Sequence, residues 1–203
     1  METTPVKTSA RKPRMRRDPV RPQLDRDNWI ETAIDLLAKE GVGGVRVEVL
    51  AKSCGVTKGS FYWHFKDRQD LLTAILECWR AGRIRDIEKT TSVAPGNERQ
   101  QLHYAIEVYG ASRNRKGIAI ELAIRDWARH DPQAASVVEA VDLYRLECTR
   151  RLFVSLGMSD AEAKSRSLLL YACVFGLSLM HYRQFDDNLG DLRQRIADRI
   201  VAD

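Results

Sequence analysis

The sequence predicts an all-α protein of about nine helices, with a small N-terminal three-helix domain and a larger C-terminal helical domain. Strand signals are scarce along the 203 residues, because apolar and polar residues rarely alternate. Gly, Pro and Asn gather instead in short clusters that separate longer helical segments. The longest apolar run, residues 168–180, is too short to cross a bilayer. These three observations favour a helical protein without a membrane span.

Each helix is bounded by a break in the sequence. The first ends in the glycines of 41–44, the second at Gly55, and the fourth before 94–97. Ser159 stands three residues before Glu162, which is the capping-box pattern at a helix start. The expected helices are 26–41, 47–54, 58–64, 68–91, 98–113, 117–130, 133–156, 160–185 and 190–202.

Residues 46–65 have the pattern of two short helices joined by a tight turn. Gly55 stands where the chain must leave the first helix through positive φ, which glycine adopts without a Cβ clash. Val56 can fill the angle between the helices, and Thr57 is a good N-cap for the second one. Two helices joined by a short turn containing Gly form a helix-turn-helix.

The second helix of this motif has an apolar inner side and a basic, aromatic outer side. Phe61 and Phe65 are four residues apart and therefore share the inner side, whereas Trp63 fits either the core or the surface. The outer groups suit phosphate oxygens and base edges, so double-stranded DNA is the expected partner. The expected DNA-binding residues are Arg46, Thr57, Lys58, Gly59, Ser60, Tyr62, Trp63, His64 and Lys66. Arg68 follows at the next helix start, where free N–H groups could also bind phosphate.

The segment from Trp29 to about Glu77 resembles the DNA-binding domain of the TetR family of transcriptional regulators. The resemblance rests on the run from Ala33 to Gly41, on the motif itself, and on Leu71-Leu72. One departure is the pair Val45-Arg46, which stands where the family often has Thr. The N-cap of the first motif helix is therefore left open.

The resemblance implies a ligand-responsive repressor that binds a palindromic operator as a homodimer. Residues 1–24 are expected to form a basic arm, 25–70 the DNA-binding domain, and 71–203 a linking helix with the effector-binding and dimerisation domain. An unknown small-molecule effector would lie in a cavity of the larger domain. Candidates for the cavity lining are Tyr109, Trp127, Tyr144, Phe175 and Met180. Candidates for the dimer interface are Ala172, Gly176, Leu192, Ile196 and Ile200.

The formal charge is concentrated at the N-terminus. Residues 1–24 contain seven Lys or Arg and two Asp or Glu, which accounts for the whole net charge of +5. Prolines and like charges predict that this arm is disordered when free. The rest of the chain is neutral, so a uniformly basic surface is excluded as the basis of nucleic-acid binding.

Other function classes find less support in the sequence. The four cysteines form no CxxC pair, which together with the lack of a signal peptide predicts reduced thiols in a cytoplasm. No GxSxG, HExxH or phosphate-binding loop is present, so an enzyme is not expected, nor is a cofactor or a metal. The alternatives left open are a DNA-binding architectural protein without an effector and, with less support, an all-α enzyme.

Overall fold

The computed structural model describes residues 24–92, 96–110, 115–182 and 184–202. Within these ranges the chain contains nine helices and no strand, which confirms the predicted all-α class. The predicted arm lies outside the described residues except for Leu24. The helices are α1 (Arg26–Gly44), α2 (Val47–Ser53), α3 (Lys58–Phe61), α4 (Arg68–Thr91), α5 (Glu98–Gly110), α6 (Arg115–Ala128), α7 (Pro132–Ser155), α8 (Asp160–Leu179) and α9 (Leu189–Val201).

Most predicted boundaries agree with the structure to within a few residues. Helix α4 covers 68–91 as predicted, and Ser159 accepts a hydrogen bond from the backbone N–H of Glu162 at the start of α8. Three predicted helix ends differ by three residues or more within the described ranges. Helix α3 stops at Phe61 and continues as a turn, and α8 stops at Leu179 rather than 185. Helix α1 extends to Gly44. Gly41, at φ 70°, kinks the helix, and a short helical turn follows the kink.

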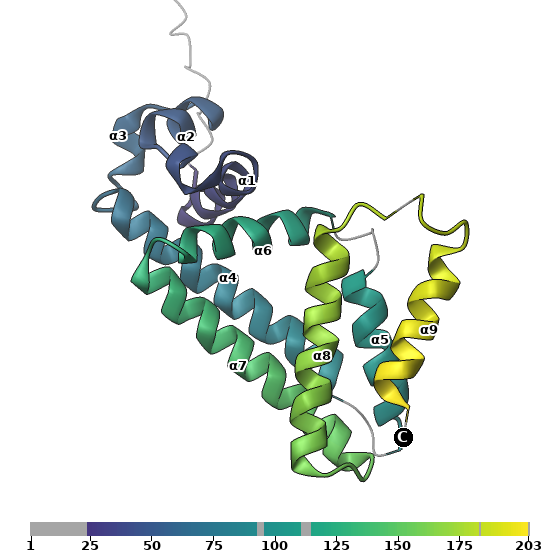
Figure 1. The fold of residues 1–203 in the computed structure, drawn as a ribbon. Coiled ribbons are helices and arrows are strands. Elements are labelled where there is room, and N and C mark those ends of the chain that lie inside the picture. Colours follow the sequence, from purple (N-terminus) through teal and green to yellow (C-terminus); the bar gives the residue numbers. More distant parts are fainter. Residues whose placement is uncertain (1–23, 93–95, 111–114, 183, 203) are drawn as a thin grey trace, which may run out of the picture.

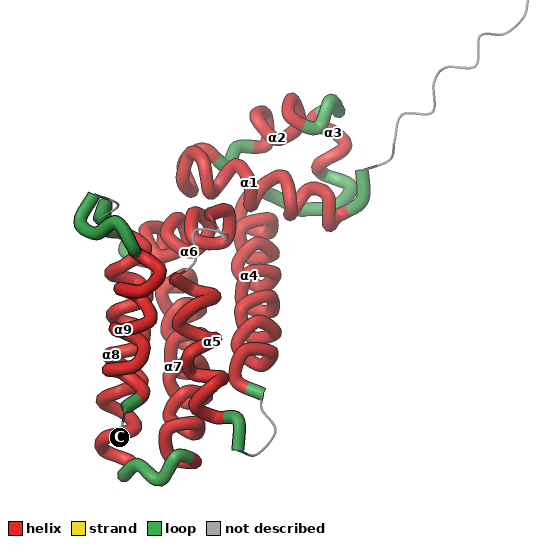
Figure 2. The backbone as a smooth tube through the Cα atoms, turned by 90° about the vertical axis from the view of Figure 1, so that its right-hand side faces the viewer, coloured by secondary structure: helices red, strands yellow, loops and turns green. Residues whose placement is uncertain are grey.

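The small domain is joined to the rest of the protein by helix α4. Figure 1 shows α1, α2 and α3 grouped at one end, with α4 leading away from them and α6 lying crosswise beneath α1. In Figure 2, α4, α5, α7, α8 and α9 run roughly alongside one another below α6. Helices α1 and α6 are directly packed, so the two domains meet along α6 as well as through α4.

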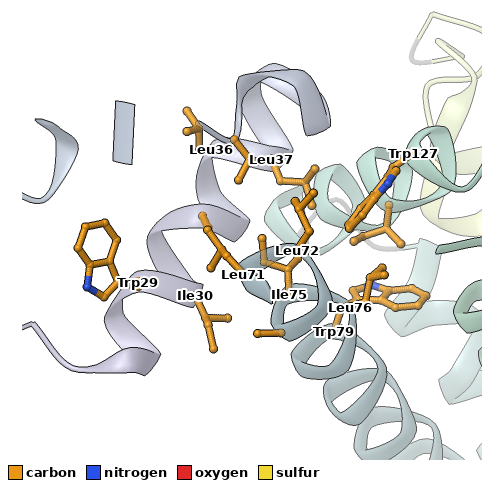
Figure 3. Packing of buried hydrophobic residues seen from close by; sticks show 14 of the residues in the cluster. Trp29, Ile30, Leu36, Leu37, Leu71, Leu72, Ile75, Leu76, Trp79 and Trp127 are labelled. Carbon is orange, nitrogen blue, oxygen red and sulfur yellow. The ribbon is translucent and has the colours of Figure 1, made fainter. Parts of the chain in front are cut away.

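One hydrophobic core crosses from the small domain into the large one. In Figure 3, Ile30 and Leu37 of α1 lie close to Leu71 and Ile75 of α4, while Trp127 of α6 lies farther along α4. The same cluster continues into α7. The predicted domain boundary after residue 70 therefore falls at the N-terminal end of a helix that packs into both domains.

A second core lies among α5, α7, α8 and α9. It includes Leu102, Phe153, Tyr171 and Ile200, one from each of these helices. Helix α8 contributes only one side to it. Its other side is apolar but exposed, as at Leu168, which is 62% exposed. No helix in the described ranges is long and apolar enough to cross a membrane.

Candidate nucleic-acid interface and effector cavity

The turn between α2 and α3 has the backbone that the sequence predicts. Gly55 has φ 66°, the left-handed conformation that glycine adopts most readily. The N–H of Val56 donates to the carbonyl of Ala51, at 3.0 Å, and closes the end of α2. The turn thus fixes the direction in which α3 leaves α2.

The inner side of α3 is anchored by aromatic rings. Phe61 and Phe65 are buried, and their rings stack with centroids 5.2 Å apart. Trp29 of α1 meets Phe61 edge to face at 5.5 Å. This packing holds the start of α3 and the following turn in one orientation.

The outer side presents the residues predicted to contact DNA. Tyr62 is 60% exposed and Trp63 is 88% exposed, so Trp63 belongs to the surface. Lys58 is exposed as well, and His64 is half-buried. The remaining predicted residues, Arg46, Thr57, Gly59, Ser60 and Lys66, are exposed or half-buried on the same motif.

Lys58 forms an ion pair across the motif. Its Nζ donates to Oε1 of Glu48 on α2, at 2.7 Å, with both side chains mostly exposed. The hydrogen bond from Lys58 lowers the pKa of the Glu48 carboxyl below its ordinary value. Because the ion pair is exposed to solvent, it contributes little free energy, and Lys58 can exchange Glu48 for another anion.

One capping expectation differs from the structure, and the N-cap that the sequence left open is identified. Thr57 is at the N-cap position of α3, but its side chain makes no capping hydrogen bond within the described residues. With only four residues, α3 is capped through the backbone instead, and the N–H of Ser60 donates to the carbonyl of Thr57. Arg46 is the N-cap of α2 and likewise makes no side-chain cap there.

Arg68 has an internal role that sequence reasoning missed. Its Nε donates to the carbonyl of Val45 and its Nη2 to the carbonyl of Val42, both at 2.6 Å. It therefore ties the α1–α2 connection to the start of α4. These bonds use two of the five N–H donors of the guanidinium, and phosphate binding at the start of α4 stays a prediction.

A cavity lies in the larger domain between α4, α6, α7 and α8. Its enclosed free space is about 30 Å³, within a hollow of about 480 Å³ that includes open solvent. The lining residues are Arg83, Gly117, Ile118, Glu121, Leu122, Arg145, Tyr171, Val174, Phe175 and Ser178.

A buried ion cluster forms one wall of this cavity. Arg125 donates to both oxygens of Asp142, at 2.8 and 2.6 Å, and to Oε1 of Glu121, at 2.8 Å. Arg145, only 1% exposed, donates to the same oxygen of Glu121 at 3.4 Å. Burial alone would lower the pKa of Arg125, but the hydrogen bond to Asp142 and the charge of Glu121 raise it above its ordinary value. The guanidinium of Arg125 also lies 4.3 Å from the ring centroid of Phe175.

Among the predicted lining residues whose side chains the structure describes, one lies in this cavity. Phe175 lines it, whereas Trp127 is buried in the core and Met180 is 63% exposed. Tyr144 faces a separate surface groove, where its hydroxyl donates to Glu88 at 3.0 Å. The side chain of Tyr109 lies outside the described residues.

The predicted interface residues fall into two groups. Ala172 is exposed on α8 and Gly176 is half-buried there. On α9, Ile200 is buried within its own chain, and Ile196 packs partly against the same core. Leu192 is half-buried. The α8 residues are thus available to a partner, whereas Ile200 is already covered by its own chain.

The ion cluster was missed because charged residues four apart on a helix usually lie on the surface. The sequence did carry a signal. Arg145 sits within the apolar stripe of α7, between Val138, Val141 and Leu152, at positions that face the core. A charge inside such a stripe indicates a buried partner on a neighbouring helix. No group of His, Cys, Asp and Glu that could hold a metal occurs in the described ranges.

The turn, the anchored short helix and the helical body with its cavity define an all-helical helix-turn-helix protein. The family model described as "Bacterial regulatory proteins, tetR family" matches residues 30–75. Residues 30–75 thus match the DNA-binding domain model of the TetR family.

Two curated relatives match about a quarter of the chain. The transcriptional regulator AcrR of Shigella flexneri is 40% identical over 55 residues, which is 27% of this chain and 26% of that protein. The class C tetracycline repressor protein of Escherichia coli is 40% identical over 55 residues, 27% of this chain and 25% of that protein. The chain thus matches about a quarter of the length of these relatives.

Solved structures resemble nearly the whole fold. A transcriptional regulator from Rhodococcus sp. Rha1 has a TM-score of 0.69 at 18% identity, over 88% of this chain and 94% of that one. A regulator from Saccharomonospora viridis, solved in complex with choline, has a TM-score of 0.69 at 16% identity, over 87% and 94%. At these identities the likeness concerns the fold alone.

Proposed function

We propose that the protein is a DNA-binding transcriptional regulator, a repressor that a small-molecule effector releases from a palindromic operator. The exposed outer side of α3 carries this proposal. The side chains of Tyr62 and Trp63 are exposed to solvent, whereas the ring of Phe61, which packs against α1, is fully buried. Large exposed aromatic side chains beside a lysine favour contact with base edges and the DNA backbone.

The regulator would act as a homodimer in the cytoplasm, where its DNA is. A single short recognition helix reads few base pairs, whereas two copies related by a two-fold axis read a palindrome. The exposed apolar side of α8, with Leu168, Leu169 and Ala172, supports pairing between two copies.

Effector control would act through α4 and α6. Both helices line the cavity, at Arg83 and Glu121, and both pack against the small domain. Lys116 of α6 also pairs with Asp35 of α1, at 2.8 Å. A ligand that favours a different orientation of α6 relative to α4 would change the distance between the recognition helices of the two copies and weaken operator binding. The cavity argues against the architectural alternative, which needs no such space.

The basic arm would add affinity by following the DNA backbone or entering the minor groove. Residues 1–22 carry seven basic side chains. Their deletion is expected to weaken operator binding and to flatten its salt dependence, because fewer counterions are released. Affinity measured across a range of salt concentrations tests this, and an unchanged slope would eliminate the arm's role.

The central test is direct. Selection from random duplex DNA should yield a palindromic sequence, and the combined substitution of Lys58, Tyr62 and His64 by alanine should abolish its binding. Lys39→Ala, on the exposed side of α1, is the control and should bind normally. If the triple variant folds and retains operator affinity, the proposed DNA-contacting surface is wrong.

A further inference from the structure

Two residues that line the cavity, Glu121 and Arg83, each carry a buried polar atom that lacks a partner. Oε2 of Glu121 and Nε of Arg83 have no hydrogen-bond partner within the described part of the chain. Glu121 is 6% exposed, so its carboxylate is almost completely removed from water. A buried polar group without a partner is unfavourable, and a ligand that supplies one gains this free energy back. One of these atoms accepts a hydrogen bond and the other donates one.

The charges around the cavity are close to balanced. Oε1 of Glu121 already accepts from Arg125 and Arg145, and Asp142 neutralises the same pair of guanidiniums. Arg83 is paired with Asp86, at 2.7 Å. A cation approaching Glu121 would therefore meet two guanidiniums, and an anion approaching Arg83 would meet the open oxygen of Glu121. Neither sign of charge is favoured, so the site suits an uncharged group.

Most of the remaining lining is apolar or aromatic, and the hydroxyl of Ser178 already donates to the carbonyl of Phe175. Ile118 and Leu122 come from α6, and Val174 and Phe175 from α8. Such a surface favours a flat ring or short hydrocarbon beside the two polar atoms.

We propose that the effector is an uncharged aromatic compound with a hydroxyl or N–H group. This group donates to Oε2 of Glu121, and a hydroxyl or carbonyl oxygen of the same compound accepts from Nε of Arg83. Both protein atoms have almost no accessible surface in the empty cavity. The ligand therefore separates α6 from α4 as it enters. This inference rests on the proposed function for its regulatory meaning, but the binding chemistry can be tested without DNA.

Four probes of similar shape separate the alternatives. They are p-cresol, toluene, 4-methylbenzoate and 4-methylbenzylammonium, titrated against the full-length protein by calorimetry or NMR. The uncharged donor, p-cresol, is expected to bind at least tenfold more tightly than the other three. Equal binding of toluene, or tighter binding of either ion, would overturn the assignment.

Two substitutions test the individual hydrogen bonds. In Glu121→Gln, the amide oxygen is expected to stay with the arginines, so that the NH₂ group faces the ligand donor and p-cresol binding falls at least tenfold. Arg83 lies outside the ion cluster, and Arg83→Lys removes Nε while keeping the positive charge. This substitution should weaken p-cresol binding several-fold and leave toluene affinity unchanged. Asp126→Asn, an exposed change on the same helix as Glu121, is the matched control. If Arg83→Lys and Glu121→Gln both fold and bind p-cresol normally, the proposal is wrong.

Operator binding separates this proposal from the proposed function. If p-cresol binds most tightly of the four probes but leaves operator affinity unchanged at saturation, the proposed ligand class is supported. The proposal that such a ligand releases the protein from its operator is then wrong. If the protein binds DNA as proposed but prefers an ion, the ligand class alone fails.

Discussion

Arg68 illustrates how a single side chain can stabilise the fold within a surface that is proposed to contact DNA. Its neighbour in sequence, Lys66, is exposed, whereas Arg68 is half-buried and bonded to two carbonyls of the α1–α2 connection. Carbonyls outside regular helix geometry need donors when they are buried. Sequence spacing alone could not distinguish the two roles, because both residues lie near the start of α4.

Replacing Arg68 tests this internal role. Arg68→Gln should lower the free energy of unfolding by about 1–3 kcal/mol, because it leaves at least one carbonyl without its donor. Urea denaturation measures the loss. Arg46→Gln, an exposed change on the same motif, is the control and should affect operator affinity and its salt slope but not stability. If Arg68→Gln reduces the salt slope at full stability, Arg68 contacts phosphate instead.

Helix α7 shows that local signals set a helix start. Asp131 accepts a hydrogen bond from the N–H of Ala134 at 2.9 Å, and Pro132 occupies the first turn. The hydrogen bond from Ala134 holds the pKa of Asp131 below its usual 3.8. The ionised carboxylate is thus the better cap.

The cap of α7 can be tested by substitution and by pH. Asp131→Ala should cost about 1 kcal/mol of stability at neutral pH. Because the folded pKa is lowered, the stabilising contribution of Asp131 is complete above pH 3.8 and is lost as the pH falls through the folded pKa. Asp131→Asn keeps an acceptor without titrating and serves as the control. Equal acid sensitivity of the wild type and Asp131→Asn in thermal unfolding would contradict this account.

The sequence predicted elements better than it predicted which side of an element is buried. Gly55, Ser159 and the break at 94–97 are local signals, so the turn and most helix ends could be found from them. Burial of Glu121 and Arg145, in contrast, depends on how α6 meets α7. The same limit applies to Trp127, whose size suits a cavity wall but which the packing of α4 and α6 places in the core.

At the scale of the whole molecule, the exposed side of α8 supports the proposed pairing of two copies. A side chain built at Gly176 would meet no other atom within 4 Å in the described chain, and Ala172 is exposed one turn earlier. Two such helices can approach closely because neither position has a large side chain. The single chain therefore leaves space on α8 that a partner helix can fill.

Substituting Ala172 by glutamate should separate the two copies. A charge buried in an apolar helix pair is unfavourable, so Ala172→Glu should shift the protein to monomers in analytical ultracentrifugation. Operator affinity should fall with it, because a palindrome needs two copies. Ala81→Glu, an exposed alanine on α4, is the matched control. A stable dimer of Ala172→Glu would place the interface elsewhere.

The continuous core that joins α1, α4, α6 and α7 limits how this regulator can be recombined with others. A fragment ending after α4 would leave the apolar side of Trp79 and Ile87 in water, so it should be poorly stable alone. Engineered hybrids that exchange the C-terminal domain must therefore keep complementary packing between α6 of the donor protein and α1 of the recipient. Grafts cut at the start of α4 without that match should aggregate, even when each parent protein folds well.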